Sequence, residues 1–435
     1  MARRKTHPPL RVFLNGRLVG TLGKSSAGAI DFQYDESWLG WEHAMPVSLS
    51  LPLREDRYIG SPVVAVFENL LPDSTSIRKS VASRFHAEGN DAYSLLSAIG
   101  RDCVGALQFL SGDEEPSPAG KIEGHPVSAK DIANILDNLA TTPLGITEEL
   151  DFRISIAGAQ EKTALLYWKD KWYTPQGTTA TTHILKPAMG VIQHGIDMSQ
   201  SVENEHFCMS FLDTLGLPTA KTSIANFAGK QVLVVERFDR QWTKDGRLLR
   251  LPQEDMCQAL SVPPDIKYES YGGPGIKRIL ELLKGSDTPQ EDQKTFLQAQ
   301  ILFWLLGATD GHAKNFSIFL APNGRYHLTP IYDVLSAQPC VDAGQLRKNG
   351  MKMAMAVGSK RHYVVHTIAF RHFVQTAKAS GISEDVVMEI GADLKKRVPQ
   401  ALEKTIDAMP KGFPADLAKS ISNGVKSRLP LLEMA

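Results

Sequence analysis

The feature that most constrains the fold of this chain is a set of three polar side chains placed around a predicted β-hairpin. Asp310 and Asn315 lie five positions apart, directly after the apolar segment 296–306. The dipeptide Asn323-Gly324 between two apolar runs is a strong hairpin signal, and Asp333 follows the second run. Such a hairpin returns Asp333 to the loop that carries Asp310 and Asn315. The sequence therefore predicts that all three side chains enter one crevice.

These residue types suit phosphoryl transfer. In protein kinases a loop Asp accepts the proton of the substrate hydroxyl, and an Asn and a later Asp hold the Mg²⁺ ions on the nucleotide phosphates. Mg²⁺ prefers carboxylates together with phosphates and water, which fits Asn315 and Asp333 as metal ligands and Asp310 as the catalytic residue. Taken alone, Asp310 is better explained as the cap of a turn. The three residues together favour the catalytic interpretation.

Composition bounds the class of protein. The chain has 435 residues with 48 basic and 48 acidic side chains, a length that predicts two or three domains with ample core. Zero net charge argues against a protein whose main task is to coat nucleic acid, although a local basic patch stays open. The four scattered cysteines predict neither a disulfide framework nor a zinc site. Because the sequence has no apolar stretch long enough for a membrane span, we expect a soluble, cytoplasmic protein with no membrane partner.

Changes of pattern divide the chain into four parts. Residues 1–112 are predicted to form a small N-terminal α/β domain that opens with an Asn-Gly hairpin. Residues 113–150 are predicted to be a linker and a bridging helix. Residues 151–240 are rich in predicted strands and form a small lobe, and residues 241–435 are mostly helical and form a large lobe. The predicted class is α+β, with the N-terminal domain packed on a two-lobed, protein-kinase-like fold.

The turn between the first two strands of the small lobe is a candidate phosphate-binding loop. Its small residues let backbone N–H groups approach phosphate oxygens. It is not a Walker A loop, because the second glycine before the lysine is missing and a strand follows. An ordinary hairpin turn explains the bare motif equally well, and its position in the lobe favours the phosphate role. The loop residues are Ala157, Gly158, Ala159, Gln160, Glu161 and Lys162.

Lys186 ends an apolar predicted strand in the same lobe. A lysine in that position commonly extends its ammonium group to solvent. In a kinase-like lobe it contacts the nucleotide phosphates instead and pairs with a helix glutamate. Glu203 and Glu205 on the following predicted helix are the candidates, and we prefer Glu205.

The predicted strand 231–239 turns polar at its end and would connect the two lobes. There the backbone of Glu236 and Phe238, on either side of Arg237, would bond the adenine edge, and Asp239 would reach the ribose. The alternative is a strand end whose charges are simply solvated.

Other polar residues are weaker candidates. His312 is more often a structural hydrogen-bonding group than a ligand in such a place. Tyr332 either packs on a nucleotide base or fills the hairpin, and Lys314 is secondary. Basic residues gather between Lys352 and Lys378, where a solvated surface is the simpler interpretation than a contact with a phosphate backbone.

Taken together, the motifs resemble those of the HipA family, the bacterial toxin kinases of HipBA toxin–antitoxin modules. The resemblance covers nearly the whole chain. The segments that carry it are 68–73 (ENLLPD), 99–102 (IGRD), 151–163 (DFRISIAGAQEKT), 251–258 (LPQEDMCQ), 268–275 (YESYGGPG) and 307–317 (GATDGHAKNFS).

The resemblance implies a serine/threonine kinase that uses ATP and Mg²⁺. It implies that Asp310 is the catalytic base, that Asn315 and Asp333 bind magnesium, and that Ser155 is an autophosphorylation site. Modification of Ser155 is expected to expel the phosphate loop and switch the enzyme off, because the new dianion cannot stay beside apolar neighbours. The implied nucleotide site comprises residues 157–162, Lys186, Glu236, Arg237, Phe238, Asp239, His312, Ala313, Lys314, Asn315, Tyr332 and Asp333.

The resemblance also implies partners. These are a HipB-like helix-turn-helix antitoxin dimer, operator DNA bound through that complex, and glutamyl-tRNA synthetase as the protein substrate, whose phosphorylation leads to growth arrest and persistence. Lys378 matches a DNA-contacting position of the family, but Gly381 stands where the family has an arginine. Direct contact with DNA is therefore in doubt. Two other functions stay open: a kinase of the same fold acting on a small molecule, and a DNA-bound co-repressor with vestigial kinase activity.

Overall fold

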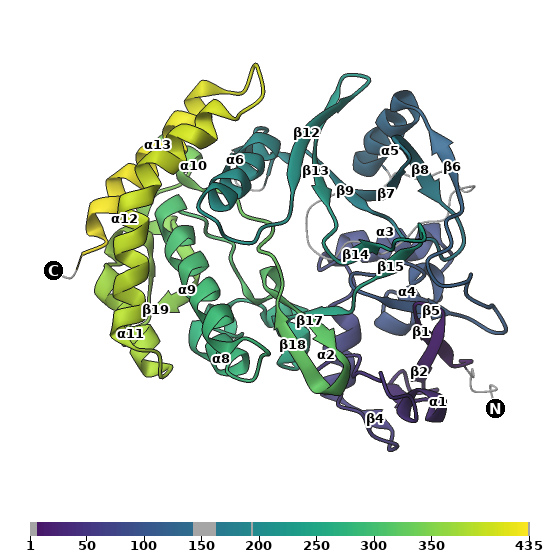
Figure 1. Ribbon diagram of the computed structural model, residues 1–435. Coiled ribbons are helices and arrows are strands. Elements are labelled where there is room, and N and C mark those ends of the chain that lie inside the picture. Colours follow the sequence, from purple (N-terminus) through teal and green to yellow (C-terminus); the bar gives the residue numbers. More distant parts are fainter. Residues whose placement is uncertain (1–6, 142–161, 193–194, 434–435) are drawn as a thin grey trace.

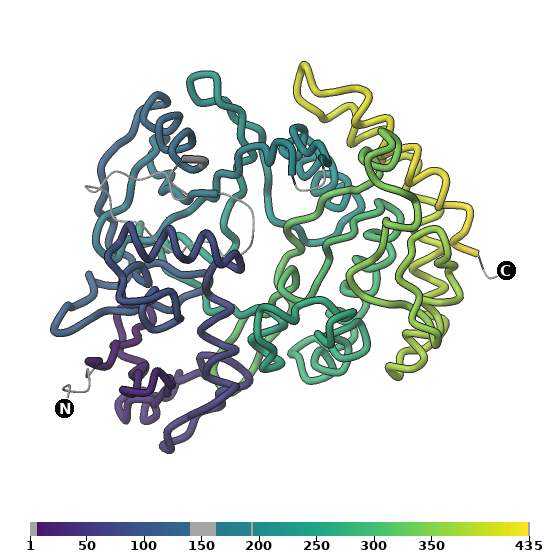
Figure 2. The backbone as a smooth tube through the Cα atoms, turned by 180° about the vertical axis from the view of Figure 1, so that it is seen from behind, coloured from purple at the N-terminus to yellow at the C-terminus, as the bar shows by residue number. Residues whose placement is uncertain are grey.

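The computed structural model describes residues 7–141, 162–192 and 195–433. It places an N-terminal domain beside a β-rich small lobe and a helical large lobe (Figure 1), and residues from all three parts line a common cleft. Seen from behind, the N-terminal domain (purple) and the C-terminal helices (yellow) lie at opposite ends of the molecule (Figure 2). This is the predicted arrangement. None of the helices in the described ranges is both long and apolar enough to cross a membrane.

The N-terminal domain is an antiparallel sheet of order β4-β3-β2-β1-β5 covered by helices. Asn15 and Gly16 both have positive φ, of 47° and 82°, as the tight Asn-Gly turn between β1 and β2 requires. Ser74 caps α3, accepting from the N–H of Ile77. The elements are β1 (Leu10–Leu14), β2 (Arg17–Lys24), β3 (Ile30–Tyr34), β4 (Tyr58–Ile59), β5 (Leu107–Leu110), α1 (Glu36–Leu39), α2 (Ser61–Glu68), α3 (Thr75–Arg84) and α4 (Ala92–Ile99).

The small lobe is a six-stranded sheet of order β12-β13-β9-β7-β8-β6. The helix α5 packs over it through an apolar cluster that includes Ile132 and Leu139, and α6 packs on β12 and β13. Its elements are β6 (Gly124–Val127), α5 (Ala129–Thr141), β7 (Thr163–Trp168), β8 (Lys171–Pro175), β9 (His183–Pro187), β10 (Gly190–Val191), β11 (Asp197–Met198), α6 (Ser201–Thr214), β12 (Thr222–Phe227) and β13 (Lys230–Glu236).

One predicted boundary is corrected. The sequence predicted a linker and a bridging helix over 113–150. The helix is present as α5, but β6 pairs with β8 along the edge of the small-lobe sheet, so residues 124–141 belong to the small lobe. The physical reason is that an edge strand pairs by backbone hydrogen bonds and needs little apolar sequence of its own.

The large lobe is built around α9, whose last eleven residues are almost wholly buried. An apolar helix without an exposed face must lie in a core, and α8, α12 and α13 surround it. The elements are β14 (Arg240–Trp242), β15 (Leu248–Arg250), β16 (Gln253–Asp255), α7 (Met256–Ala259), α8 (Ile276–Leu283), α9 (Pro289–Leu306), β17 (Ser317–Ala321), β18 (Arg325–Leu328), α10 (Gln338–Asp342), β19 (Lys352–Val357), β20 (His362–Val364), α11 (Phe370–Ala379), α12 (Glu384–Asp407) and α13 (Ala415–Arg428).

Candidate active site

A cleft with about 1400 Å³ of space, including its solvent-filled mouth, lies where the three parts meet. The small lobe contributes Lys162 and Lys186, the large lobe contributes Asp310, and the N-terminal domain contributes Asp73. The predicted nucleotide-site residues in the described ranges therefore line one cleft, with the exception of Ala313. The loop residues Ser155, Ala157, Gly158, Ala159, Gln160 and Glu161 lie outside the described residues.

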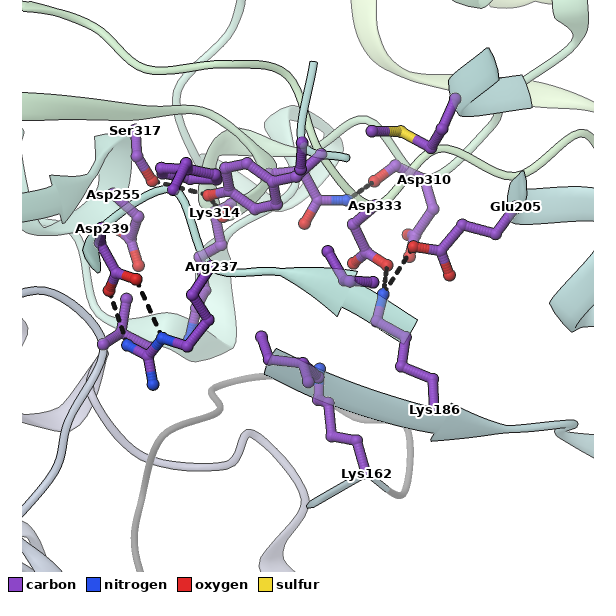
Figure 3. A pocket seen from close by; sticks show the side chains of 18 of the residues that line it. Lys162, Lys186, Glu205, Arg237, Asp239, Asp255, Asp310, Lys314, Ser317 and Asp333 are labelled. Carbon is purple, nitrogen blue, oxygen red and sulfur yellow. Dashed lines mark hydrogen bonds and ion pairs between the residues drawn. The ribbon is translucent and has the colours of Figure 1, made fainter. Parts of the chain in front are cut away.

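Lys186 lies at the centre of an ion-pair network (Figure 3). Its Nζ is 2.7 Å from Oε1 of Glu205 on α6 and 2.6 Å from Oδ1 of Asp333. The predicted pairing with Glu205 is confirmed, whereas Glu203 instead accepts a hydrogen bond from Gln231. Burial by itself lowers the pKa of Lys186, but the two carboxylates outweigh it and raise the pKa above its ordinary value. The ammonium group is therefore charged and held in the cleft.

Lys162, at the start of β7, is the second cation on this wall (Figure 3). Burial, followed by the positive charge of Lys186, lowers the pKa of Lys162 to about 8. No ion pair joins Lys162 to an acid among the described residues. A lysine that is destabilised in its charged form and faces a cleft is suited to bind an anion, because the anion's charge restores its proton.

The loop that carries Asp310 begins where α9 ends. Gly307 closes the helix in the left-handed conformation, with φ 66°, which glycine adopts without steric cost. A Cβ at Gly311 would meet the ring of Phe303 at 2.6 Å, so only glycine permits this close approach. The amide Nδ2 of Asn315 donates to the backbone carbonyl of Asp310 at 2.8 Å and locks the loop. The predicted pair is thus brought together by one hydrogen bond.

The Asp310 side chain is 64% exposed in the cleft. The surrounding protein nonetheless desolvates it and raises its pKa, while a hydrogen bond from Tyr268 opposes the rise. Its Oδ1 accepts from the Tyr268 hydroxyl at 2.5 Å. Because Oδ2 has no partner among the described residues, that oxygen is available to a hydroxyl group of a substrate.

Asp333 has the backbone that aims a side chain into a cleft. Its φ of 61° is rare for a residue other than glycine, and such strain gathers at functional sites. Burial raises the pKa of Asp333, but the charges of Lys186 and Lys162 outweigh burial and lower the pKa well below its usual range. The carboxylate is therefore ionised at any physiological pH.

Asn315 and Asp333 fit a divalent cation. The amide nitrogen of Asn315 donates to the loop, so its side-chain oxygen stays available to a cation. Asp333 binds Lys186 through Oδ1 alone. Within the described ranges, no group of three or more His, Cys, Asp or Glu residues is able to hold a metal ion. Mg²⁺ commonly uses one or two protein oxygens together with phosphates and water, and these two residues would supply them.

The end of β13 has the backbone pattern expected of a nucleotide-binding hinge. The N–H of Glu236 donates to the carbonyl of Lys221, and the N–H of Arg237 donates to that of Thr182, both at 2.9 Å. β13 ends at Glu236, and Phe238 lies in the turn that follows. No hydrogen bond engages the N–H of Phe238 among the described residues. Glu236 and Phe238 line the cleft.

The side chains of Arg237 and Asp239 line the cleft but are paired with each other. The guanidinium group of Arg237 donates to both carboxylate oxygens of Asp239, at 2.9 and 2.6 Å, and further to Thr181 and to the carbonyl of Cys103. Asp239 also accepts from the N–H of Gly105. Arg237 therefore belongs to a buried scaffold that ties the small lobe to the N-terminal domain. Asp239 keeps a place on the cleft wall, but its carboxylate already serves that scaffold.

Lys314 lines the cleft, but its charge is also paired within the protein. Its Nζ binds Oδ1 of Asp73 at 2.6 Å, so its charge is neutralised by the N-terminal domain. The hydroxyl of Tyr332 donates to the carbonyl of Lys314 at 2.8 Å, and its ring lies 5.6 Å from that of Phe238. Burial lowers the pKa of His312 to about 3, which keeps that ring neutral. The adjacent Ala313 is buried in the core of the lobe.

Sequence reasoning missed three residues at this site: Asp73, Lys267 and Tyr268. Two of them lie in motifs that carried the family resemblance, ENLLPD at 68–73 and YESYGGPG at 268–275. The presence of those motifs was therefore a signal. No spacing rule links them to Asp310, because their partners are far away in the sequence.

Lys378 lies on the surface near the end of α11. Its side chain is 59% exposed, and its Nζ forms an ion pair with Glu384 at 2.5 Å. Gly381 follows with φ 79°, a conformation that an arginine would rarely adopt. The structure thus supplies no cluster of unpaired charge at Lys378 itself.

Comparisons with known proteins agree with this geometry. Residues 10–110 match the family model HipA N-terminal domain, and residues 154–402 match the model HipA-like C-terminal domain. The chain is 37% identical to the protein Y4mE of Sinorhizobium fredii over 355 residues, which is 81% of each chain. It is 26% identical over 418 residues to the serine/threonine-protein kinase toxin HipA of Shewanella oneidensis, covering 92% of this chain and 90% of that protein.

A solved structure agrees as well. HipA in the Shewanella oneidensis complex of HipA, HipB and operator DNA superposes with a TM-score of 0.79 at 25% identity, covering 98% of this chain and 96% of that one. The predicted fold and the resemblance seen in the sequence are both confirmed. The chain belongs to the HipA family of serine/threonine-protein kinase toxins.

Proposed function

We propose that this chain transfers the γ-phosphoryl group of ATP, with Mg²⁺ bound, to a serine or threonine hydroxyl of a protein. The observation that carries the proposal is the meeting of Lys186, Glu205 and Asp333 in the cleft that also holds Asp310. A lysine paired with a helix glutamate and a metal-binding aspartate is the arrangement that positions phosphates in kinases.

The roles of the residues follow from their geometry. Lys186 and Lys162 offer positive charge to the phosphates. The backbone N–H of Phe238 offers a donor to the base, and the backbone carbonyl of Glu236 offers an acceptor. Asp310 accepts the proton of the substrate hydroxyl through its open oxygen. Mg²⁺, held by Asn315 and Asp333, would neutralise charge on the phosphates.

Replacement of one carboxylate tests the proposal. Asp310→Asn keeps the size of the side chain and removes the proton acceptor, so we expect phosphate transfer from γ-labelled ATP to fall by about 100-fold or more. Asp265→Asn, at an exposed position of a short 3-10 helix outside the cleft lining, is the matched control and retains the normal rate. Normal transfer by the Asp310 variant would refute the proposal. Label appearing in a metabolite of a cell extract, and not in a protein, would favour a small-molecule kinase.

We further propose that the chain acts in the cytoplasm as the toxin of a toxin–antitoxin module, with a HipB-like helix-turn-helix dimer as its inhibitor and with operator DNA reached through that complex. Support comes from the relative solved with HipB and operator DNA. Glutamyl-tRNA synthetase is the proposed substrate, and its modification would cause growth arrest and persistence. Incubation of both purified proteins with γ-labelled ATP tests this. An unlabelled synthetase beside an active kinase would reject the substrate and leave the kinase assignment intact.

Self-modification at Ser155 is the proposed off-switch. The mass of the purified chain should exceed that of Ser155→Ala by one phosphate beyond the difference in side chains. Equal phosphate content in both proteins would reject this site.

A further inference from the structure

The hydroxyl of Tyr268 contacts Asp310, the proposed catalytic base of the candidate active site. It donates to Oδ1 of Asp310 at 2.5 Å, across 42 residues of sequence. The Tyr268 ring also packs edge-on against His312, with centroids 4.9 Å apart and an interplanar angle of 90°. One carboxylate oxygen of Asp310 is thereby occupied by a group that the phosphoryl transfer described above does not use.

Tyr268 is held in place from both sides of the chain. The preceding Lys267 binds Oδ2 of Asp73 at 2.7 Å, and both side chains are only 13% exposed. The following Glu269 accepts from the N–H of Ala356 at 2.6 Å. A tyrosine fixed between two such anchors keeps its ring, and hence its hydroxyl, in a single position.

Asp73 binds both segments that surround the catalytic base, Asp310. Its Oδ2 holds Lys267, next to Tyr268, and its Oδ1 holds Lys314 at 2.6 Å, four residues after Asp310. Asp73 belongs to the N-terminal domain. That domain therefore ties the tyrosine and the catalytic loop to a single carboxylate.

Two roles are compatible with a hydroxyl at this place: it either blocks the base or orients it. The contact uses Oδ1 only, and the Asp310 side chain stays 64% exposed. A blocking group would cover the oxygen that faces the cleft. A donor to one oxygen instead stops the carboxylate from rotating and presents the second oxygen to the incoming hydroxyl, and it also stabilises the ionised form.

We propose that Tyr268 is a positioning residue that orients Asp310, and that the N-terminal domain fixes it through the Asp73–Lys267 ion pair. The inference rests on the proposed kinase function and extends it. It makes the N-terminal domain part of the catalytic apparatus, because a carboxylate from that domain sets the geometry of the base.

Tyr268→Phe tests the proposal, because it removes the hydroxyl and keeps the ring against His312. We expect kcat for transfer of γ-labelled phosphate to the proteins of a cell extract to fall by about tenfold, with KM for ATP unchanged. Loss of the donor should also move the acid limb of the kcat–pH profile to higher pH, because the ionised form of Asp310 loses a stabilising partner. A purely structural role would leave that limb in place.

Tyr271→Phe, at a side chain 71% exposed three residues away, is the matched control and should leave rate and profile unchanged. Asp73→Asn should also lower kcat, because it releases the Lys267 anchor of Tyr268. An unshifted acid limb in Tyr268→Phe, or a faster Tyr268→Phe enzyme, would overturn the proposal. Activity of the unaltered chain that depends on Asp310 would leave the kinase function standing in that case.

Discussion

Nucleotide binding should take up a proton at Lys162, and this can be worked out from the structure. Burial and the neighbouring Lys186 lower the pKa of Lys162 to about 8 in the free protein. Bound phosphates should return that pKa to its ordinary value of about 10.4 or above. Only the protonated lysine attracts the phosphates, so at alkaline pH part of the binding free energy is used to protonate Lys162.

The size of the effect follows from the linkage between protonation and binding. With a pKa of about 8, the apparent Kd contains a factor of roughly 1.1 at pH 7 and roughly 11 at pH 9. Binding should therefore weaken about tenfold, or about 1.4 kcal/mol, over this range. The phosphate's own second ionisation, with a pKa of about 6, is nearly complete by pH 7 and does not mimic the change.

Titration calorimetry with a non-hydrolysable ATP analogue and Mg²⁺ measures this directly. In buffers of different ionisation enthalpy, uptake of about half a proton per nucleotide is expected at pH 8. Lys162→Met should bind more weakly at pH 7 and lose the pH dependence, whereas Lys171→Met, at an exposed position on β8, should keep it. A Kd that is constant from pH 7 to 9, or an unchanged dependence in Lys162→Met, would refute the reasoning.

Two further predictions concern stability. Asp102→Asn should lower the free energy of unfolding by about 3–5 kcal/mol, because the fully buried Asp102 carboxylate binds Arg240 at 3.0 Å and Arg250 at 2.8 Å. Urea unfolding measures this loss. Asp137→Asn, at an exposed position, is the control and should change the free energy of unfolding by less than about 1 kcal/mol. Burial raises the pKa of Glu254 to about 8, above its unfolded value, so its contribution is fully favourable below about pH 4.3 and is lost as pH rises toward 8. As pH rises from 5 to 8, Glu254→Gln should therefore gain stability relative to the unaltered chain, by up to about 1.4 kcal/mol per pH unit. A stability difference between the two proteins that is the same at pH 5 and pH 8 in thermal melting would contradict this.

Much of the fold could be predicted because it rests on short-range rules. The Asn-Gly turns at 15–16 and 323–324 need positive φ at both positions, which the structure has, and the apolar run before Gly307 could only be a buried helix. The segment 48–53 (SLSLPL) alternates polar and apolar residues as an extended strand would, but it forms turns and bends. There the Ser50 hydroxyl donates to the distant carbonyl of Gln258.

The sequence by itself determined the candidate chemistry: a base, two oxygen ligands and a lysine, each recognisable from its spacing or its place at the end of a predicted element. Only the tertiary structure decided which charged groups face the cleft. Arg237 lines the cleft, but its guanidinium group is paired with an acid two residues away and with the Cys103 carbonyl 134 residues away. Asp73 joins the site by pairing with Lys314 across 241 residues. Spacing rules describe neighbours along the chain, whereas a buried charge takes whichever partner the packing of distant segments brings near it.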